Sequence, residues 1–217
     1  YHCTKCGYGR GNTAFTVTDC DLEGGVITVN GRDKITLALK SIYNVYNILA
    51  CYAVCSLTGV DGSDIAAYLS DYFLTNGRVV RFTLGEAKGT LLTSKHENSV
   101  SYDQSLRYTV QQKAPHDVII IVDAVSRKYF TGETSWLYDI NFGILNTDNT
   151  EHIYLLGKYC NDLYVRFSYT DIPKEKITVM ESIPEAAELI RNSKAKEIYT
   201  VTCFSDKDKF LSLVDVR

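Results

Sequence analysis

The strongest constraint on the fold is a regular alternation of short apolar segments and amphipathic segments from about Thr83 onward. The apolar segments favour strands, and the intervening segments have one apolar face, which is typical of helices. Short all-apolar strands joined by helices indicate a parallel sheet that is covered on both faces. The pattern therefore predicts an α/β fold with a Rossmann-like parallel sheet and helices on both faces. The expected strands are Gly89–Thr93, Val118–Val122, Ile153–Leu156, Ile177–Met180 and Ile198–Thr202, and the expected helices are 101–113, 161–169, 184–192 and 206–213.

The residues before Thr83 follow a different pattern, which indicates a separate domain. Residues 14–18, 26–30 and 35–39 are prone to form strands, with a Gly-Gly turn signal between the first two. Val45, Ile48, Leu49 and Tyr52 then recur at the spacing of a helix with one buried face. A second helix over 63–73 and a strand over 78–83 complete this part. We expect one domain over residues 1–82 and another over 83–217.

Composition excludes several classes of protein. The 217 residues are 45% hydrophobic and 23% charged, and the formal charge of −3 comes without a basic stripe, so a nucleic-acid partner is not favoured. No apolar run approaches the roughly 18 residues of a membrane span. The seven cysteines are odd in number and dispersed, which favours a reducing cytoplasm over a secreted disulfide scaffold. Five of them lie among apolar residues and are expected in cores: Cys20, Cys51, Cys55, Cys160 and Cys203.

A CxxCG motif at Cys3, Cys6 and Gly7 opens the chain. Two thiolates at this spacing can bind one tetrahedral Zn²⁺, but a structural zinc site needs four ligands. No second CxxC or HxxxH follows. Because the chain begins at Tyr1 and not at Met, we expect upstream residues, and the other two ligands would come from there. The alternative is that Cys3 and Cys6 are two ordinary thiols.

Asn44 and Asn47 lie three residues apart at the start of the first predicted helix. They share one edge of that helix, where both side chains would be able to hydrogen-bond a flat polar ligand such as a nucleobase. The alternative, which we favour on these residues alone, is that Asn44 caps the helix and Asn47 makes a buried polar contact. Neither a GxxxxGK[ST] phosphate loop nor a GxSxG motif occurs, so the chain has no self-contained ATP site or serine-hydrolase site.

The segment Gly132–Asp139 has the most unusual composition, with the only tryptophan, two acids and two hydroxyl side chains. It follows the strand that ends at Val122, and is therefore expected at the carboxyl edge of the sheet, where α/β proteins bind their ligands. Gly157 and Lys158 also follow a strand and precede a helix. They predict either an anion site at a helix N-terminus or a tight turn.

These motifs, in this order, resemble the carboxy-terminal half of the MurT family, the Mur-ligase-like subunits that amidate peptidoglycan precursors. YHCTKCGY resembles the second knuckle of that family's four-cysteine ribbon, and YNVYNILACYAV resembles the helix of Mur ligases that lies near the adenine. NGRVVRF, which contains Arg78, resembles the segment that ends the central ATPase domain. ETSWLYDINF, from Glu133, is close to a signature of the carboxy-terminal domain.

The resemblance implies the tail of a Mur-ligase central domain followed by a Mur-ligase carboxy-terminal domain. It implies ATP and Mg²⁺ in the full-length protein, with Asn44, Asn47 and Arg78 as this chain's contribution to the nucleotide site. It also implies a lipid-linked muropeptide substrate, a GatD-like class I glutaminase as partner, and a cytoplasmic location at the inner face of the membrane. Glu133 would complete the Cys-His pair of the glutaminase, since a carboxylate that accepts the imidazole N–H fixes its tautomer.

Two segments depart from the family pattern. The stretch before the acid usually resembles NDNxADGxD, whereas Val122–Glu133 reads VDAVSRKYFTGE. The segment that usually resembles KNPAG is Ser94–Val100, which reads SKHENSV. An alternative to the ligase subunit is therefore a diverged, non-catalytic Mur-ligase-like domain that serves as a docking module for another protein.

Overall fold

The computed structural model of the chain describes residues 2–9, 11–72, 78–95, 98–124 and 132–216. Its residues form two compact units, Tyr1–Phe73 and Leu74–Arg217. The units divide earlier than the boundary expected near Thr83, because the strand β4 (Val79–Leu84) pairs with β5 (Ala87–Ser94) in the sheet of the second unit. No helix in the described ranges is long and apolar enough to cross a membrane.

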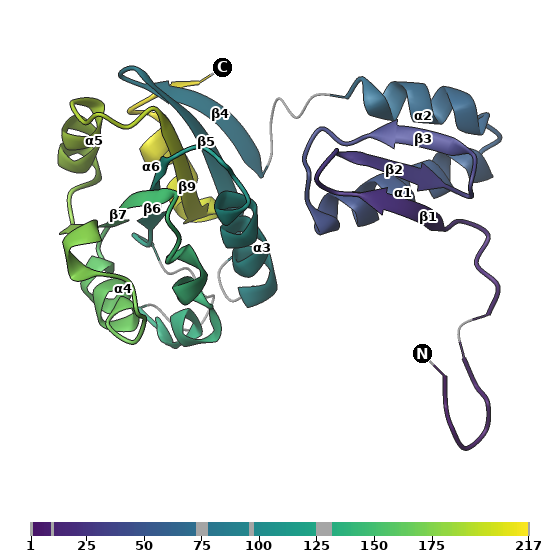
Figure 1. Cartoon of the computed structure of the whole chain (residues 1–217), viewed down its shortest axis with the longest axis horizontal. Helices are drawn as coiled ribbons and strands as arrows, with labels where there is room; N and C mark the ends of the chain where they lie inside the picture. The colour runs from purple at the N-terminus through teal and green to yellow at the C-terminus, as the bar shows by residue number, and fades with distance from the viewer. Residues whose placement is uncertain (1, 10, 73–77, 96–97, 125–131, 217) are drawn as a thin grey trace. The chain divides into compact units, whose positions relative to one another are not determined.

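Unit 1 is a three-stranded antiparallel sheet with two helices. The strands are in the order β1-β2-β3, so that β2 lies between its two neighbours (Figure 1). Its core joins Ile27, Val29 and Ile35 of the sheet to one face of each helix. Val45, Ile48 and Tyr52 are buried on α1, as the helical spacing predicted. The elements are β1 (Val17–Asp21), β2 (Val26–Val29), β3 (Asp33–Thr36), α1 (Ile42–Leu57) and α2 (Gly62–Ser70).

Unit 2 is built around a seven-stranded sheet in the order β10-β4-β5-β9-β6-β7-β8. The five strands from β5 to β8 in that order are parallel to one another, and β4 and β10 close one edge in antiparallel pairing. The predicted Rossmann-like parallel sheet is thereby confirmed, with an antiparallel edge added. The remaining elements are α3 (Ser99–Val110), β6 (His116–Ile121), η1 (Ser135–Asp139), η2 (Phe142–Leu145), β7 (Thr150–Leu156), α4 (Cys160–Phe167), η3 (Lys174–Lys176), β8 (Ile177–Met180), α5 (Ile183–Arg191), β9 (Glu197–Cys203), α6 (Phe204–Leu211) and β10 (Asp215–Val216).

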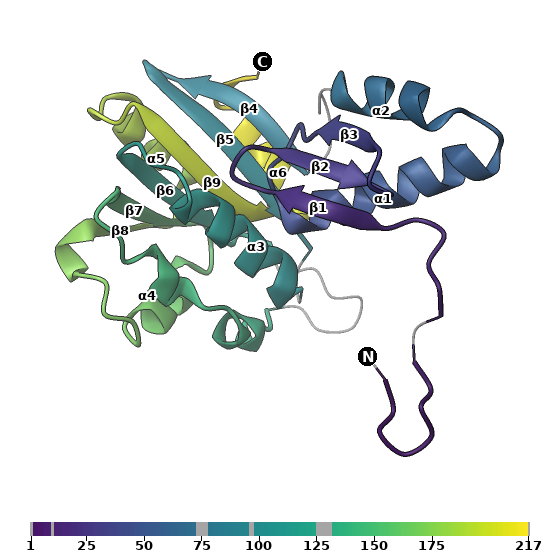
Figure 2. The ribbon, with the colours of Figure 1, turned by 45° about the vertical axis from the view of Figure 1, so that its right-hand side comes forward.

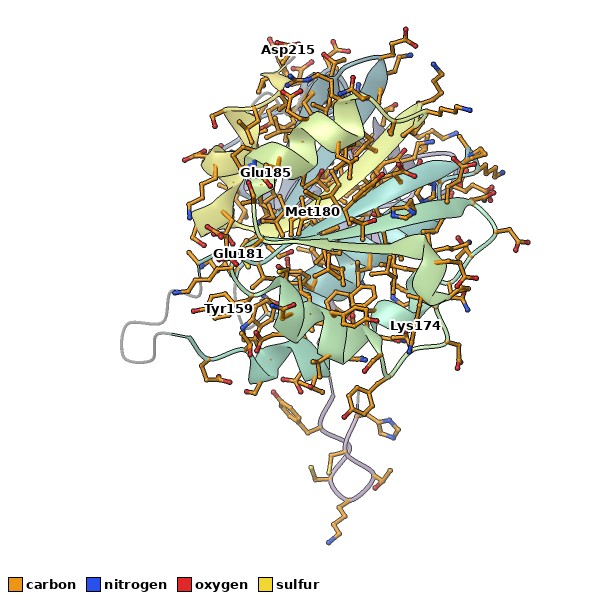
Figure 3. The ribbon with its side chains drawn as sticks, turned by 90° about the vertical axis from the view of Figure 1, so that its left-hand side faces the viewer. Tyr159, Lys174, Met180, Glu181, Glu185 and Asp215 are labelled. Carbon is orange, nitrogen blue, oxygen red and sulfur yellow. The ribbon has the colours of Figure 1, made fainter. Side chains whose placement is uncertain are left out.

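Helices cover both faces of this sheet. The view onto β8 in Figure 3 shows Met180 at the end of the strand, with Glu185 of α5 on one side and Tyr159, which precedes α4, on the other. The helices α5 and α6 pack on one face, and α3 and α4 pack on the other (Figure 2). The short helices η1 and η2 contact α3, and η1 also contacts α4. Each buried strand is therefore apolar on both sides, which explains its nearly unbroken apolar sequence.

Polar side chains satisfy the first N–H groups of α2, α3 and α5. The side chain of Asp61 accepts a hydrogen bond from the Ser63 N–H at the start of α2. Asn98 does the same for Ser101 at α3, and Ser182 does so for Glu185 at α5. Such caps stabilise a helix start by about 1 kcal/mol each.

Cysteine positions differ in part from the expectation of buried thiols. Cys160 and Cys203 are buried, and Cys55 is half-buried, whereas Cys20 and Cys51 are exposed. Apolar neighbours in the sequence therefore do not predict burial at Cys20 and Cys51, since a strand or helix exposes one side whatever its neighbours are.

Candidate functional site

The carboxyl ends of β6 and β9 are joined by a buried carboxylate. Asp206, on the first turn of α6, has no exposed surface. Its two oxygens accept the backbone N–H groups of Asp123 and Ala124, at 2.9 and 2.8 Å. Asp206 therefore fixes the backbone at the point where the chain leaves β6 for the segment that leads to Glu133.

Asp123 in turn connects this edge to α4 and α6. Its carboxylate accepts the backbone N–H of Lys158 at 2.8 Å and forms an ion pair with the Lys209 ammonium. Desolvation raises the pKa of Asp123, but the hydrogen bonds from Lys209 and Lys158 outweigh it and hold the pKa below its usual range. The hydrogen bond to Asp123 likewise raises the pKa of Lys209. We call Asp123, Asp206, Lys158 and Lys209 the Asp123 cluster.

Gly157 allows the close approach of two strand ends in this cluster. Its φ is +96°, and an added Cβ would lie 2.7 Å from the Val122 carbonyl oxygen and 2.9 Å from the Asp123 Cβ. The Lys158 N–H that follows is taken by Asp123. Of the two structures that the sequence allowed here, Gly157 and Lys158 form the tight turn. The Lys158 N–H, which was the other candidate's anion site, is occupied by the Asp123 carboxylate.

Glu133 lies at the start of η1, in a short segment that is tied to α4. Its Oε1 accepts the N–H of Ser135, the first residue of the short helix, at 2.7 Å. The neighbouring Thr134 hydroxyl donates to Asp162 of α4 at 2.9 Å. Beyond it, Trp136 is buried against Tyr102 of α3, with ring centroids 5.3 Å apart. The tryptophan anchors the segment, and the half-buried Glu133 carboxylate is held in a defined place.

The three residues expected at a nucleotide site lie in different units. Asn44 is buried in unit 1, and its side-chain amide donates to the Leu39 carbonyl at 3.0 Å. Asn47 is exposed on the same helix. Asn44, not Asn47, therefore makes the buried polar contact, and the N-cap position belongs to Ser41. Arg78 is exposed in unit 2, where its guanidinium lies 5.8 Å from the Phe204 ring centroid and donates to the Ser101 hydroxyl.

Cys3 and Cys6 lie in a tight turn near the start of the chain. The Cys3 carbonyl accepts the Gly7 N–H at 2.9 Å, and Gly7 has a φ of +71°. The nearby backbone of Cys6 and Lys5, and then the Cys6 side chain, lower the pKa of the Cys3 thiol. A lowered thiol pKa favours the thiolate that a metal requires. Across the described part of the chain, no group of three or more His, Cys, Asp or Glu side chains is arranged to hold a metal ion.

The sequence singled out Glu133 but not the residues that anchor the segments around it. Asp206 and Lys209 are more than 80 residues from Asp123 in the chain, and only the parallel pairing of β6 with β9 brings them together. Asp162 was likewise unremarkable in the sequence. Much of the two segments that depart from the family pattern, residues 96–97 and 125–131, lies outside the described residues.

Comparison with known proteins identifies the family. The model described as "MurT ligase C-terminal" matches residues 96–206, about half of the chain. The MurT subunit of lipid II isoglutaminyl synthase (glutamine-hydrolyzing) from Streptococcus pneumoniae is 24% identical over 100% of this chain and 48% of its own length. The protein of the same description from Staphylococcus aureus is 23% identical over 79% of this chain and 38% of its own length. The chain thus spans half or less of the length of these curated relatives.

Solved structures show the same fold. MurF from Acinetobacter baumannii has a TM-score of 0.64 at 15% identity, over 92% of this chain and 44% of that one. A pseudomurein peptide ligase type C from Methanothermus fervidus has a TM-score of 0.63 at 14% identity, over 95% of this chain and 42% of that one. At these identities the likeness is one of fold, and it confirms the Mur-ligase architecture that the sequence predicted. Together with the family match, it leads to one conclusion: the chain belongs to the MurT ligase C-terminal family.

Proposed function

We propose that this chain is the carboxy-terminal half of the ligase subunit of a lipid II isoglutaminyl synthase. The observation that carries the proposal is the match of the whole chain to the pneumococcal protein of that description. In the proposed reaction, ATP converts the α-carboxylate of the D-glutamate in lipid II to an acyl phosphate. Ammonia from glutamine then displaces the phosphate and leaves an amide. The reaction would take place in the cytoplasm, at the inner face of the membrane that holds the lipid-linked substrate.

Glu133 is this chain's proposed contribution to a GatD-like class I glutaminase. Its carboxylate would accept the N–H of the partner's catalytic histidine and stabilise the imidazolium that forms when the cysteine loses its proton. The hydrogen bond from Ser135 supports this role, because it fixes one carboxylate oxygen before the partner binds. The Thr134–Asp162 bond fixes the adjacent backbone. A carboxylate held in this way loses little conformational entropy on binding.

Asn44, Asn47 and Arg78 are the proposed contribution to the nucleotide site of the full-length protein, where ATP and Mg²⁺ would supply the phosphoryl group. The exposed side chains of Asn47 and Arg78 suit this role better than that of Asn44. Asn44 donates to Leu39, so its part would be to hold the start of α1. Calorimetry on the full-length protein with a non-hydrolysable ATP analogue tests the assignment. Arg78→Ala and Asn47→Ala should each weaken binding by about tenfold, and affinity equal to wild type in both variants would contradict it.

Cys3 and Cys6 are proposed to hold half of a structural zinc site. Their turn and the lowered pKa of the Cys3 thiol fit a two-thiolate knuckle, and Zn²⁺ would bind them together with two cysteines outside this chain. The full-length protein should contain one zinc per molecule by mass spectrometry, and the variant with Cys3→Ser and Cys6→Ser should lose it. The variant Cys20→Ser is the matched control, because Cys20 is also an exposed thiol of unit 1. Full zinc content in the double variant would rule out this site.

The role of Glu133 is tested in the complex of the full-length protein with its glutaminase subunit. Glu133→Gln keeps the size of the side chain and its hydrogen bond from Ser135 but removes the charge. We expect glutaminase kcat to fall by roughly 10²-fold or more, as expected when the carboxylate that orients a catalytic histidine is lost. Asp139→Asn, at an exposed acid on the same short helix, should leave kcat unchanged. Glutaminase turnover in Glu133→Gln equal to wild type would refute the role.

A further inference from the structure

Two cysteines stand one turn apart on α1 of unit 1. Cys51 and Cys55 are four residues apart in this helix, so their side chains are neighbours on its surface. Cys51 is exposed, and Cys55 is half-buried and packs against the core of the unit. Both thiols are free. A single cysteine in such a place is usually a small apolar side chain, but two neighbouring thiols can hold one ligand between them.

The pKa of Cys51 agrees with a close pair. Desolvation, and then the nearby Cys55 thiol, raises the pKa of Cys51. Cys51 is therefore a neutral thiol at neutral pH. A neutral thiol reacts slowly with peroxides and disulfides, because the thiolate is the nucleophile. A ligand that displaces the proton suits Cys51 better than a redox reaction does.

Helix geometry also disfavours a disulfide between the two thiols. In an α-helix the Cβ atoms of residues four apart lie about 5–6 Å from each other. A disulfide needs a Cβ–Cβ distance of about 3.8 Å, so it would form only if the last turns of α1 unwound. Those turns are closed by the Thr58 N–H, which donates to the carbonyls of Val54 and Cys55 at 3.2 and 3.1 Å. A ligand that adds one atom between the two sulfurs spans the longer distance without this change.

The number and the softness of the donors decide which ion fits. Zn²⁺ in a structural site takes four ligands, and Ca²⁺ and Mg²⁺ take oxygen ligands. Within the ranges that the structure describes, no third His, Cys, Asp or Glu side chain joins the pair in a metal-binding group. Thiolates are soft donors that select Cu(I). Because Cu(I) is satisfied by two thiolates in a linear arrangement, the pair on α1 supplies its whole ligand set.

We propose that Cys51 and Cys55 bind one Cu(I) ion between their sulfur atoms. Each thiol loses its proton and forms one copper–sulfur bond. The copper keeps its oxidation state, so no oxidant or reductant takes part, and the ion with its two thiolates carries one negative charge. Because binding releases protons, the apparent affinity should rise with pH. The inference goes beyond the proposed function, since no step of the amidation uses these thiols.

The test uses the reduced full-length protein, titrated anaerobically with Cu(I) against the chromophoric chelator bathocuproine disulfonate. Cys51→Ser and Cys55→Ser should each bind one equivalent of Cu(I) less than wild type does. The result is a difference between variants, so copper at other cysteines, such as Cys3 and Cys6, cancels. Cys20→Ser is the matched control, because Cys20 is also an exposed thiol of unit 1, and it should bind as much copper as wild type.

Two further measurements separate a bridging ion from other effects. The affinity for the equivalent that Cys51→Ser loses should weaken roughly tenfold or more between pH 8 and pH 6, because protons compete with the ion. Far-UV circular dichroism of wild type should stay the same on loading, because the ion bridges the thiols without unwinding α1. The same spectrum of each copper-free variant shows that the serine variants are folded.

Three results would overturn the site. The first is equal copper content in wild type, Cys51→Ser and Cys55→Ser. The second is the loss of the same equivalent in Cys20→Ser, because the ion would then lie between thiols of different elements. The third is a disulfide between Cys51 and Cys55 in the purified protein, detected by mass spectrometry, because the thiols would then be closer than the helix allows.

Discussion

Replacement of Asp206 should destabilise unit 2 more than any other single change of a polar side chain in the Asp123 cluster. The carboxylate is fully buried and accepts two backbone N–H groups, from Asp123 and Ala124. A hydrogen bond to a charged group contributes about 1.5–3 kcal/mol, and a buried N–H without an acceptor has a similar cost. Asp206→Ala removes both acceptors and should lower the free energy of unfolding by about 3–6 kcal/mol. Asp206→Asn keeps one oxygen and should lose about half of that.

Urea denaturation followed by the fluorescence of Trp136 measures this loss. Trp136 is the only tryptophan and is buried in unit 2, so the signal reports the unfolding of that unit. With a urea dependence of about 2 kcal/mol per molar, the midpoint of Asp206→Asn should fall by roughly 1 M. Asp208→Asn, at an exposed acid of the same helix, is the control and should stay within about 0.5 kcal/mol of wild type. A midpoint of Asp206→Asn equal to that of Asp208→Asn would refute the reasoning.

Three further predictions concern other positions. Desolvation, and then the nearby Glu151, raises the pKa of Asp117 to about 6. The folded state therefore binds the proton more tightly than the unfolded state, and stability falls as pH rises from about 4 to 6. Asp117→Asn should stabilise unit 2 by about 1–3 kcal/mol at pH 7.5 and should reduce the loss of stability between pH 4 and 6. The free energy of unfolding, followed by Trp136 fluorescence, would contradict this if its pH dependence were the same as that of wild type. Gly157→Ala should lower the melting temperature of unit 2 by several degrees, because the added Cβ meets the backbone of Val122 at a positive φ; Gly11→Ala, where nothing lies within 4 Å, is the control. In unit 1, Tyr52→Phe removes the hydroxyl that donates to the buried Asp33 and should cost about 1–3 kcal/mol at pH 7, measured by circular dichroism. Hydrogen bonds from Arg32 and Tyr52 lower the pKa of Asp33, although desolvation opposes them. The stability that the ionised Asp33 contributes is therefore lost as pH falls, and Tyr52→Phe should differ less from wild type at pH 3.

Strands and helices of unit 2 were predictable because each carries a strong local signal. The run Val118–Val122 is wholly apolar, and α5 begins with the cap Ser182 followed at once by its apolar face. Such signals do not show which strands pair with each other. The strand at Arg78–Thr83 was recognised but was assigned to the first domain, because nothing local shows that it turns at Gly85 and Glu86 to pair with β5.

Element ends were less predictable where side chains replace the ladder of backbone hydrogen bonds. The first strand was expected over 14–18, whereas β1 runs from Val17 to Asp21. Asn30 accounts for the difference, since its side chain bonds both the Ala14 carbonyl and the Thr16 N–H. The short β10 carries too few residues for any periodic signal.

The candidate site was predictable only as far as its composition is unusual. The segment Gly132–Asp139 was noticeable for its composition and its expected place at the carboxyl edge of the sheet, and Glu133 was singled out because ETSWLYDINF resembles a signature of the family. Asp206 and Asp162 are single acids on exposed-looking helices, and their roles depend on contacts with residues 83 and 28 positions away. Contacts at such separation have no local pattern, so the way Asp206 and Asp162 anchor these segments is visible only in three dimensions.

The place of β9 in the sheet has a consequence for the synthesis of the protein. β9 lies between β5 and β6, and pairs Lys88 with Glu197 on one side and Asp117 with Ile198 on the other. The central strand of the sheet thus leaves the ribosome after its two neighbours and after β4, β7 and β8. Until it emerges, two long apolar edges stand open to other chains, which is the situation in which nascent α/β domains aggregate. A growing chain of this kind should depend on a chaperone that shields β5 and β6 until residue 203 has been added.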